Sequence, residues 1–312
     1  MKASDPTPSR AGPEVTILMC TYNGAPFLEE QLLSIERQSY RNWRLVACDD
    51  GSTDQTREIL SEFDSKTGGR CITRVAGGRK GFVHNYLTLA CDETAKGDFF
   101  AFCDQDDAWE PDKLARALAW LTEVPDTVPA LYCSRTKHMD TFGKEIGYSR
   151  LFTGCPTFAN ALVQSIAGGN TMVFNEATRR LIRLVGVVDA PAHDWLLYLL
   201  VTAVEGSVKY DPYPAVRYRL HRDNAIGNPG WLRRLDMLLN NRFRLLIGKN
   251  LAILNSFRPH MTARNNVILD EFSKVRELRL RGRMCAFYRS GVHRKSIFGN
   301  MGLLLAVVLG KL

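Results

Sequence analysis

The chain has 312 residues, of which 45% are hydrophobic and 24% are charged. These values are ordinary for a globular protein, so the composition argues against wholesale disorder and against a coiled-coil rod. The length suits one large α/β domain with an appendage, or two domains. The net charge of +8 is unevenly placed, because residues 231–312 contain 16 Lys and Arg against 4 Asp and Glu. Such a basic region is typical of proteins that meet nucleic acid or an anionic membrane surface.

Cysteine usage and the first residues predict a cytoplasmic protein. None of the eight cysteines belongs to a Cys-x-x-Cys pair, and most lie in apolar runs such as VTILMC and FFAFC. In such runs cysteine behaves as a small buried hydrophobe, so a disulfide framework is not expected. Residues 1–13 contain no apolar core of a signal peptide and read as a flexible tail.

Strand-length apolar runs alternate with helical patterns up to residue 121. The predicted strands are Val15–Cys20, Trp43–Cys48, Cys71–Val75 and Phe99–Cys103. The predicted helices are Phe27–Gln38, Asp54–Phe63, Val83–Ala90 and Asp112–Leu121. This alternation indicates βαβ units and a mostly parallel sheet. The strands lack polar alternation, as expected where helices cover both faces of the sheet.

The alternation weakens after residue 130. Further strands are predicted at Ala130–Ser134, Thr171–Phe174 and Val216–Leu220, and helices at Glu176–Leu184 and Trp195–Val204. From Trp231 to Leu280 the chain has a basic, amphipathic helical pattern, and it ends in an apolar stretch shorter than the ~20 residues that span a bilayer. We therefore expect a tail at 1–13, an α/β domain at 14–228 and a basic helical region at 229–312. That region would dock on a membrane, cap the domain or form an oligomer interface.

Polar loops follow four of the predicted strands. They are Thr21-Tyr22-Asn23-Gly24, then Asp49-Asp50-Gly51-Ser52-Thr53-Asp54, then Gly77-Gly78-Arg79-Lys80-Gly81, and finally Asp104-Gln105-Asp106-Asp107. In an open parallel sheet, ligands bind beyond the carboxyl ends of the strands. The sequence therefore predicts a site where these loops converge.

Most of these loops also have purely structural interpretations. Asn-Gly and Asp-Gly favour turns, and Ser52 or Thr53 suits a helix N-cap. These roles leave Asp49 unexplained, and an acid at that position suits a hydrogen bond to a nucleobase or a ribose. Arg79 and Lys80 are equally consistent with solvated surface charge.

Three carboxylates lie within the four residues Asp104-Gln105-Asp106-Asp107. At a partly buried strand end these groups would repel one another, and a divalent cation would offset the repulsion. Mg²⁺ characteristically binds one or two carboxylates together with substrate phosphates. The alternative is an acidic helix N-terminus without a metal. We favour the metal site.

The order VTILMCTYNG, VACDDGSTDQT and FCDQDDAW resembles the inverting family 2 glycosyltransferases, which have the GT-A fold. AGGNTMVFN, AHDWLLY and YRLHRDNAIG resemble the rhamnosyltransferase-like bacterial branch, so the resemblance covers about residues 15–228. It implies a Rossmann-like, mostly parallel sheet flanked by helices. It also implies transfer of a sugar from a nucleoside diphosphate to a hydroxyl of a glycan or lipid-linked acceptor, in cell-surface polysaccharide synthesis.

The resemblance also assigns the donor side of the site. It places the nucleotide, expected to be dTDP or UDP and carrying rhamnose in the leading hypothesis, against Thr21, Tyr22, Asn23, Asp49, Asp50, Arg79, Asn85 and Asp104, with Arg219 as a further candidate. It places Mg²⁺ or Mn²⁺ on Asp104, Asp106 and His221, with Asp107 behind them. A surface histidine without a ligand remains the alternative for His221.

Asp194 matches the catalytic base of the family, where Glu-Asp is commoner than the His193-Asp194 of this chain. A carboxylate there would take the proton of the acceptor hydroxyl in a single inverting displacement, although the position also suits a helix N-cap. The acceptor is expected near Gly169, Asn170, His193 and Trp195. The same Gly-Asn pair could instead be a plain loop entering a strand.

Two other classes of protein remain open. A sugar-nucleotide nucleotidyltransferase would place a basic, glycine-rich loop after the first strand, and TYNGAPFLEE has no such charge. A non-catalytic nucleotide- or nucleic-acid-binding module would use the basic region, but it leaves the clustered acids unexplained. We therefore expect a glycosyltransferase without a nucleic-acid partner, either cytoplasmic or peripheral on the inner face of the cytoplasmic membrane.

Overall fold

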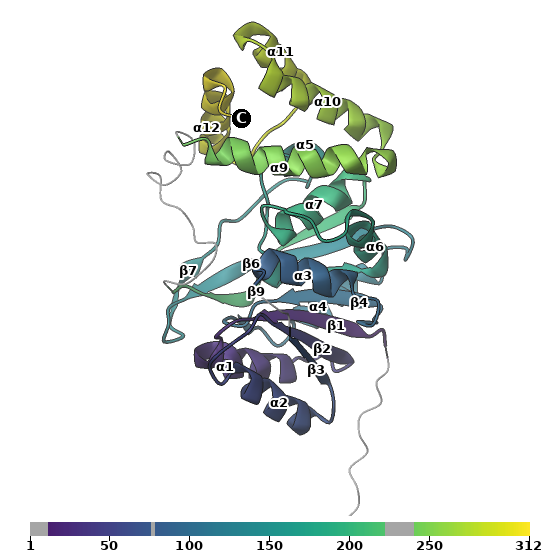
Figure 1. The fold of residues 1–312 in the computed structure, drawn as a ribbon, viewed down its shortest axis with the longest axis vertical. Helices are drawn as coiled ribbons and strands as arrows, with labels where there is room; N and C mark the ends of the chain where they lie inside the picture. Colours follow the sequence, from purple (N-terminus) through teal and green to yellow (C-terminus); the bar gives the residue numbers. More distant parts are fainter. Residues whose placement is uncertain (1–11, 76–78, 222–239) are drawn as a thin grey trace, which may run out of the picture.

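The computed structural model describes residues 12–75, 79–221 and 240–312. The predicted tail at 1–13 and the part of the predicted basic helical region before residue 240 lie almost wholly outside these residues. The structure is layered, with a central sheet, helices on both of its faces, and a group of C-terminal helices at one end (Figure 1).

The first half of the sheet is parallel, as the sequence predicts. Its strands β1 (Val15–Thr21), β2 (Trp43–Asp49), β3 (Cys71–Val75) and β4 (Phe99–Cys103) lie in the order β3-β2-β1-β4. The connecting helices are α1 (Ala25–Glu36), α2 (Thr56–Thr67) and α3 (Phe82–Cys91). Every residue of β4 is buried, because helices cover both faces of this strand.

The second half of the sheet is mixed and holds longer strands than the sequence predicts. Strand β8 (Val173–Asn175) runs antiparallel to both β4 and β6 (Ala130–Met139), and β6 pairs in parallel with β9 (Ser207–Arg219). The short strands β5 (Ala108–Trp109) and β7 (Glu145–Tyr148) pair with β9 and β6. Most of β9 lacks the hydrophobic pattern of a strand, because it contains prolines at 212 and 214 and many polar residues.

Two apolar cores lie on opposite faces of the sheet. One is built from α1, α2 and α4 (Lys113–Leu121), which pack on one face. The other contains α3, the short α5 (Phe158–Ala161), α6 (Glu176–Val185) and α7 (His193–Ala203). Every residue of α7 is buried, so this helix is the centre of the second core.

The C-terminal helices extend the second core. They are α9 (Arg242–Phe257), α10 (Ala263–Glu277), α11 (Leu280–Ser290) and α12 (Ile297–Leu309). Leu254 and Phe272 are buried in the same cluster as Tyr198 of α7. Asn265 of α10 donates from Nδ2 to the carbonyl oxygens of Thr202 and Ala203, at 3.0 Å each. Within the described parts of the chain, no helix has the length and apolarity that crossing a bilayer requires.

Candidate active site

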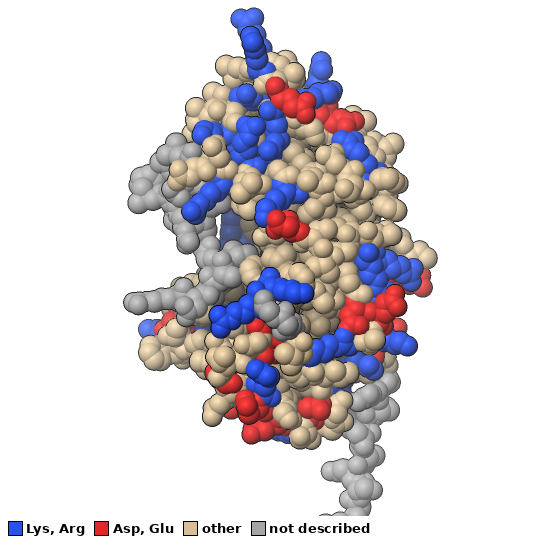
Figure 2. Space-filling model, in the orientation of Figure 1, with Lys and Arg blue, Asp and Glu red and all other residues tan. Residues whose placement is uncertain are grey.

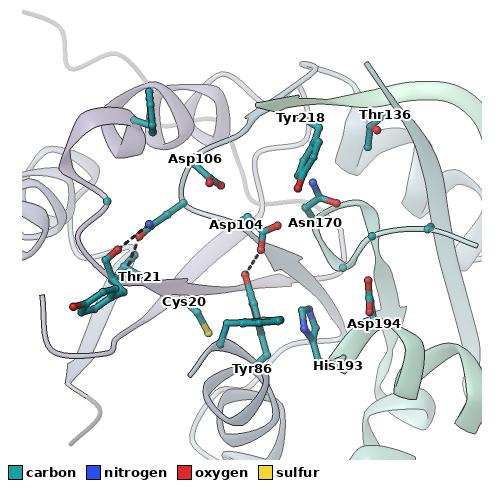
Figure 3. Close-up of a pocket in the computed structure, with 18 of the residues that line it drawn as sticks. Cys20, Thr21, Tyr86, Asp104, Asp106, Thr136, Asn170, His193, Asp194 and Tyr218 are labelled. Atoms are coloured by element: carbon teal, nitrogen blue, oxygen red, sulfur yellow. Dashed lines mark hydrogen bonds between the residues drawn. The ribbon is translucent and has the colours of Figure 1, made fainter. Parts of the chain in front are cut away.

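A cleft of about 950 Å³ opens at the carboxyl ends of β1 and β4 (Figure 3). Its walls come from the loops after β1, β2 and β4, from α3, from the turn before β8, and from the start of α7. The predicted site residues that line it are Thr21, Tyr22, Asn23, Asp50, Asn85, Asp104, Asp106, Gly169, Asn170, His193, Asp194 and His221. The fold thus brings together residues that are up to 200 positions apart in the sequence.

The loop after β1 is fixed by hydrogen bonds to its two neighbours. The side chain of Gln105 accepts from the backbone N–H of Tyr22 at 2.8 Å and donates to its carbonyl oxygen at 3.0 Å. Asn23 has a φ of 46°, and its side chain accepts from the N–H of Thr53 at 2.9 Å. A Cβ at residue 24 would collide with the side-chain amide of Gln105, so a larger residue there would displace this amide from Tyr22. Gln105 was not among the predicted site residues, although it lies within the acidic motif.

The two acids after β2 have different positions. Asp49 is fully buried and does not line the cleft, because its carboxylate accepts hydrogen bonds from Thr21 and from the backbone N–H of Ser52 and pairs with Arg57 at 3.3 Å. It therefore shapes the loop rather than presenting an oxygen to a ligand. Asp50 does line the cleft, and it accepts from the backbone N–H groups of Lys80 and Gly81 at 3.1 and 3.0 Å.

Two further predicted donor-side residues also differ in placement. Arg79 is exposed and does not line the cleft, but its guanidinium lies 4.9 Å from the ring centroid of Tyr22. Asn85 of α3 is buried in the cleft wall, and among the described residues its Nδ2 has no hydrogen-bond partner. Such a group is available to a ligand.

The acidic motif after β4 holds two carboxylates in the cleft. The hydroxyl of Tyr86 donates to Oδ1 of Asp104 at 2.7 Å (Figure 3). Burial, together with the charge of the nearby Asp106, raises the pKa of Asp104 to about 7. Oδ2 of Asp106 lies 2.7 Å from Nε2 of His221. The two acids and the histidine therefore lie along one wall.

Asp107 is turned away from the cleft. It is fully buried, and its carboxylate accepts a hydrogen bond from Nδ2 of Asn170 and another from the backbone N–H of Arg219, the latter at 3.1 Å. The guanidinium of Arg219 donates in turn to the carbonyl oxygen of Asp106 at 2.9 Å and pairs with Glu30. These bonds join the acidic motif to the turn before β8 and to the end of β9.

The donor atoms of this wall suit a divalent cation of the Mg²⁺ type. Carboxylate oxygens are its preferred protein ligands, and it keeps positions for substrate phosphates. The pKa of Asp104 is raised first by burial and then by the charge of Asp106, and a bound cation would favour the ionised form. Among the described residues, no three His, Cys, Asp or Glu side chains are placed so that they could hold a metal ion together, so the protein groups of this wall do not form a complete site by themselves. The residues thus fit a cation whose coordination a bound diphosphate completes.

Asp194 lies in the first turn of α7 and lines the cleft. The N-cap of this helix is Ala192, so the predicted capping alternative for Asp194 does not apply. Its Oδ1 accepts from the N–H of Trp195 at 2.6 Å. Burial raises the pKa of Asp194 to about 6, although hydrogen bonds from backbone amides, including that of Gly169, act in the opposite direction. A carboxylate with this pKa is ionised at neutral pH and more basic than an exposed aspartate.

The neighbours of Asp194 differ from each other in orientation. The His193 ring stacks on Tyr86 with centroids 4.1 Å apart, and burial lowers its pKa to about 3. Among the described residues, neither ring nitrogen of His193 has a hydrogen-bond partner, and a Cβ at Gly169 would collide with Nε2. Trp195 does not line the cleft, because its indole is buried and donates to the carbonyl oxygen of Ala161 at 2.7 Å. It is therefore a packing residue.

Sequence reasoning missed one wall of the cleft. Alternate residues of β6 face into it, followed by residues from the next segment and from β9: Ser134, Thr136, His138, Ser149, Phe152 and Tyr218. The available signal was the period-2 pattern of Ser134-Arg135-Thr136-Lys137-His138, which places three small or neutral groups on one face of a strand. Hydroxyls and aromatic rings without charge are suited to hydrogen bonding and stacking with a sugar.

The chain is similar to several known glycosyltransferases. The chain is 26% identical over 247 residues to the dTDP-rhamnosyl transferase RfbG of Shigella flexneri, which covers 74% of this chain and 82% of that protein. The solved structure of S. aureus TarS 1-349 with UDP-GlcNAc has a TM-score of 0.55 at 16% identity, over 86% of this chain and 82% of that one. The mannosyltransferase PcManGT of Pyrobaculum calidifontis, solved with GDP-Man and Mn²⁺, has a TM-score of 0.52 at 21% identity, over 99% and 84%.

The structural neighbours confirm the predicted GT-A fold. The model of a family described as glycosyl transferase family 2 matches residues 16–181, which is more than half of the chain. The matched region contains the loops after β1, β2 and β4 that line the cleft. The predicted resemblance is thereby confirmed, and the chain belongs to glycosyl transferase family 2.

Proposed function

We propose that this glycosyltransferase moves a sugar from a nucleoside diphosphate to an acceptor hydroxyl in a single displacement that inverts the anomeric carbon. The observation that carries the proposal is the shared cleft of Asp194 with Asp104 and Asp106. One carboxylate of raised basicity comes from α7, and the other two come from the end of β4. Asp194 could therefore accept a proton, while Asp104 and Asp106 could hold a leaving group.

The donor would lie against the loops after β1, β2 and β4. Thr21, Tyr22 and Asn23 would contact the base and ribose, with Asp50 and the unpartnered Nδ2 of Asn85 as further contacts. Arg79 would act through the ring of Tyr22, and Asp49 by shaping the loop. A dTDP-sugar, with rhamnose as the leading candidate, is supported by the name of the Shigella flexneri relative. A UDP-sugar is the alternative, supported by the UDP-GlcNAc bound to TarS.

Asp104, Asp106 and His221 would hold the divalent cation, either Mg²⁺ or Mn²⁺. The bound cation would supply charge stabilisation to the diphosphate as the bond to the sugar breaks. Other side chains of the protein position these two carboxylates. The Tyr86 hydroxyl donates to Asp104, and the Arg219 guanidinium donates to the backbone carbonyl of Asp106. The Mn²⁺ in the Pyrobaculum calidifontis mannosyltransferase supports a divalent ion in this fold.

Asp194 would accept the proton of the acceptor hydroxyl as its oxygen attacks the sugar. Because α7 is buried along its whole length, the helix fixes the position of this carboxylate. The acceptor would lie against Gly169, Asn170 and the neutral imidazole of His193, and along the β6 wall of hydroxyls and rings. We infer a glycan or lipid-linked oligosaccharide acceptor, in polysaccharide synthesis at the cytoplasmic side of the membrane.

The replacement Asp194→Asn tests the base assignment. It keeps the size of the side chain but removes its basicity, so the rate of sugar transfer should fall at least about 10³-fold. The Kd for the nucleoside diphosphate should change little. Rates from a donor panel that includes dTDP-rhamnose and UDP-hexoses, with calorimetric binding of dTDP and UDP plus Mn²⁺, give both quantities. Asp189→Asn is the matched control, because its exposed carboxylate lies just before the same helix. Transfer by Asp194→Asn within tenfold of the wild-type rate would contradict the assignment.

A further inference from the structure

Helix α12 exposes an apolar face that nothing in the described chain covers. The helix contains no charged residue, and Leu303, Ala306 and Val307 pack inward. Its outward residues are Ile297, Phe298, Met301, Leu304, Leu305, Val308 and Leu309, and Ile297 and Phe298 are 79% and 83% exposed. We call these seven residues the α12 face. A helix that is apolar all round is normally buried on all sides or in contact with lipid, so one side of α12 lacks its expected partner.

The segment that carries the α12 face contains only positive charge. Residues 279–312 contain seven Lys and Arg and no Asp or Glu. Arg279, Arg281 and Arg289 on or beside α11 are exposed. Figure 2 shows basic side chains gathered over the C-terminal helices with a few acidic ones beside them, whereas acidic and basic residues alternate over the other end of the molecule. The apolar face thus belongs to a positively charged segment.

The apolar side chains and the positive charge together indicate which partner the α12 face binds. A second copy joined across a two-fold axis would place the same positively charged segment against itself, and the like charges would oppose the contact. A bilayer rich in anionic lipid meets both features, because acyl chains accept the apolar side chains and headgroups attract the arginines. At 13 residues, or about 20 Å, α12 is too short to cross the ~30 Å hydrocarbon core. It would therefore lie in the plane of the interface.

We propose that the α12 face docks the enzyme on an anionic lipid surface. Ile297 and Phe298, at the first turn of the helix, enter the boundary between headgroups and acyl chains most deeply. Tyr288 of α11, which is 87% exposed, lies at headgroup level as amphipathic rings do. A lipid-linked acceptor would be met on the same surface. That last step rests on the proposed function, but the docking itself does not.

The test is sedimentation of the full chain with vesicles, without any sugar donor. Wild-type protein should bind vesicles of phosphatidylglycerol and phosphatidylcholine, and should bind pure phosphatidylcholine vesicles at least tenfold more weakly. The double variant Ile297→Ser/Phe298→Ser should weaken binding to the anionic vesicles by at least tenfold. Arg281→Gln/Arg289→Gln should weaken it by about fivefold for each charge, with a smaller effect in high salt.

The matched control is Phe142→Ser, because Phe142 is 94% exposed in the turn between β6 and β7, outside the C-terminal helices, and should not alter vesicle binding. Unchanged binding by the Ile297/Phe298 variant, or no binding by wild type, would overturn the proposal. So would a wild-type dimer in analytical ultracentrifugation that the same variant converts to a monomer, since the occupant would then be a second copy. Asp194→Asn should bind vesicles like wild type, so failure of docking and failure of the transferase assignment can be told apart.

Discussion

Asp194 and His193 are neighbours whose pKa values burial moves in opposite directions. Burial disfavours the charged form of each, so the pKa of Asp194 rises to about 6 and that of His193 falls to about 3. At neutral pH the aspartate is still ionised, whereas the imidazole is uncharged. The pair therefore offers one anion and one neutral hydrogen-bonding group to the cleft. This division of roles suits a base beside a group that orients a sugar hydroxyl.

The pKa of Asp194 predicts the pH dependence of turnover. The carboxylate must be ionised to accept a proton, and its raised pKa means that protonation begins as the pH falls towards 6. At saturating donor and Mn²⁺, kcat should be level above about pH 7 and should fall about tenfold per unit below the pKa. The measurement is kcat against pH from 4.5 to 8.5. A profile that is flat down to pH 4.5 would rule out Asp194 as the titrating base.

At the scale of elements, Arg179 joins α6 to the end of α3. Its guanidinium is buried and donates to the carbonyl oxygens of Ala90, Asp92 and Ala95, and it lies 4.2 Å from the ring centroid of Phe100. The last carbonyls of a helix have no partner within the helix itself. Arg179 therefore closes α3, the helix that carries Asn85 and Tyr86 into the cleft.

Replacing Arg179 should destabilise the whole fold. Arg179→Met keeps much of the apolar stem but removes the guanidinium donor from the buried carbonyl oxygens of Ala90 and Ala95, at about 1–3 kcal/mol each, whereas the Asp92 carbonyl keeps the N–H of Ala95. We expect a loss of at least about 2 kcal/mol in the free energy of unfolding, measured by urea denaturation. Arg180→Met, on the same helix with a side chain that is 66% exposed, should change it by less than about 0.5 kcal/mol. Equal effects of the two replacements would refute the interpretation.

At the scale of the whole molecule, the C-terminal helices and the catalytic half share one core. Leu254, Phe257, Leu269 and Phe272 are buried in the cluster that contains α7. Asn265 satisfies the last carbonyls of α7 at the end opposite to Asp194. The basic helices are therefore part of the scaffold that holds the proposed base, whatever else they bind.

A chain that ends at residue 241 should consequently be unstable. Removing α9 to α12 uncovers one side of α7 and leaves the carbonyls of Thr202 and Ala203 without their side-chain donor. Because each large buried side chain that becomes exposed costs about 1.5–3 kcal/mol, we expect an insoluble product or one without a cooperative thermal transition. Differential scanning calorimetry of the truncated chain and of the full chain measures this transition. A truncated chain with an unchanged Tm would show that the α/β part folds alone.

The sequence was most informative where strands are covered on both faces. The predicted bounds of Phe99–Cys103 coincide with β4, because continuous apolar runs between turn signals define such strands well. The bounds of Cys71–Val75 also coincide with β3, although this edge strand is mostly exposed. The rule that ligands bind at the carboxyl ends then placed Thr21 and Asp104 in one cleft. Strand β9 was mostly missed, since its prolines and polar residues resemble a loop until β6 pairs with it.

Side-chain direction was the part that sequence alone could not supply. Asp49 and Asp50 are adjacent, but only the second faces the cleft, because successive residues at a strand end point to opposite sides. Trp195 follows Asp194 by one residue, and about 100° of helical rotation turns it towards α5. Which of these side chains face the cleft depends on the exact residue at which a strand or helix begins or ends. A hydrophobic pattern defines such boundaries least well.

The bonds of Asp107 have a consequence for protein engineering. This one carboxyl group ties the acidic motif to Asn170 in the turn before β8 and to the backbone of Arg219 at the end of β9. A chimaera whose residue at position 170 cannot donate would remove a hydrogen bond from the buried Asp107. Recombination between donor and acceptor specificities in this scaffold must therefore transplant residues 107 and 170 as a unit.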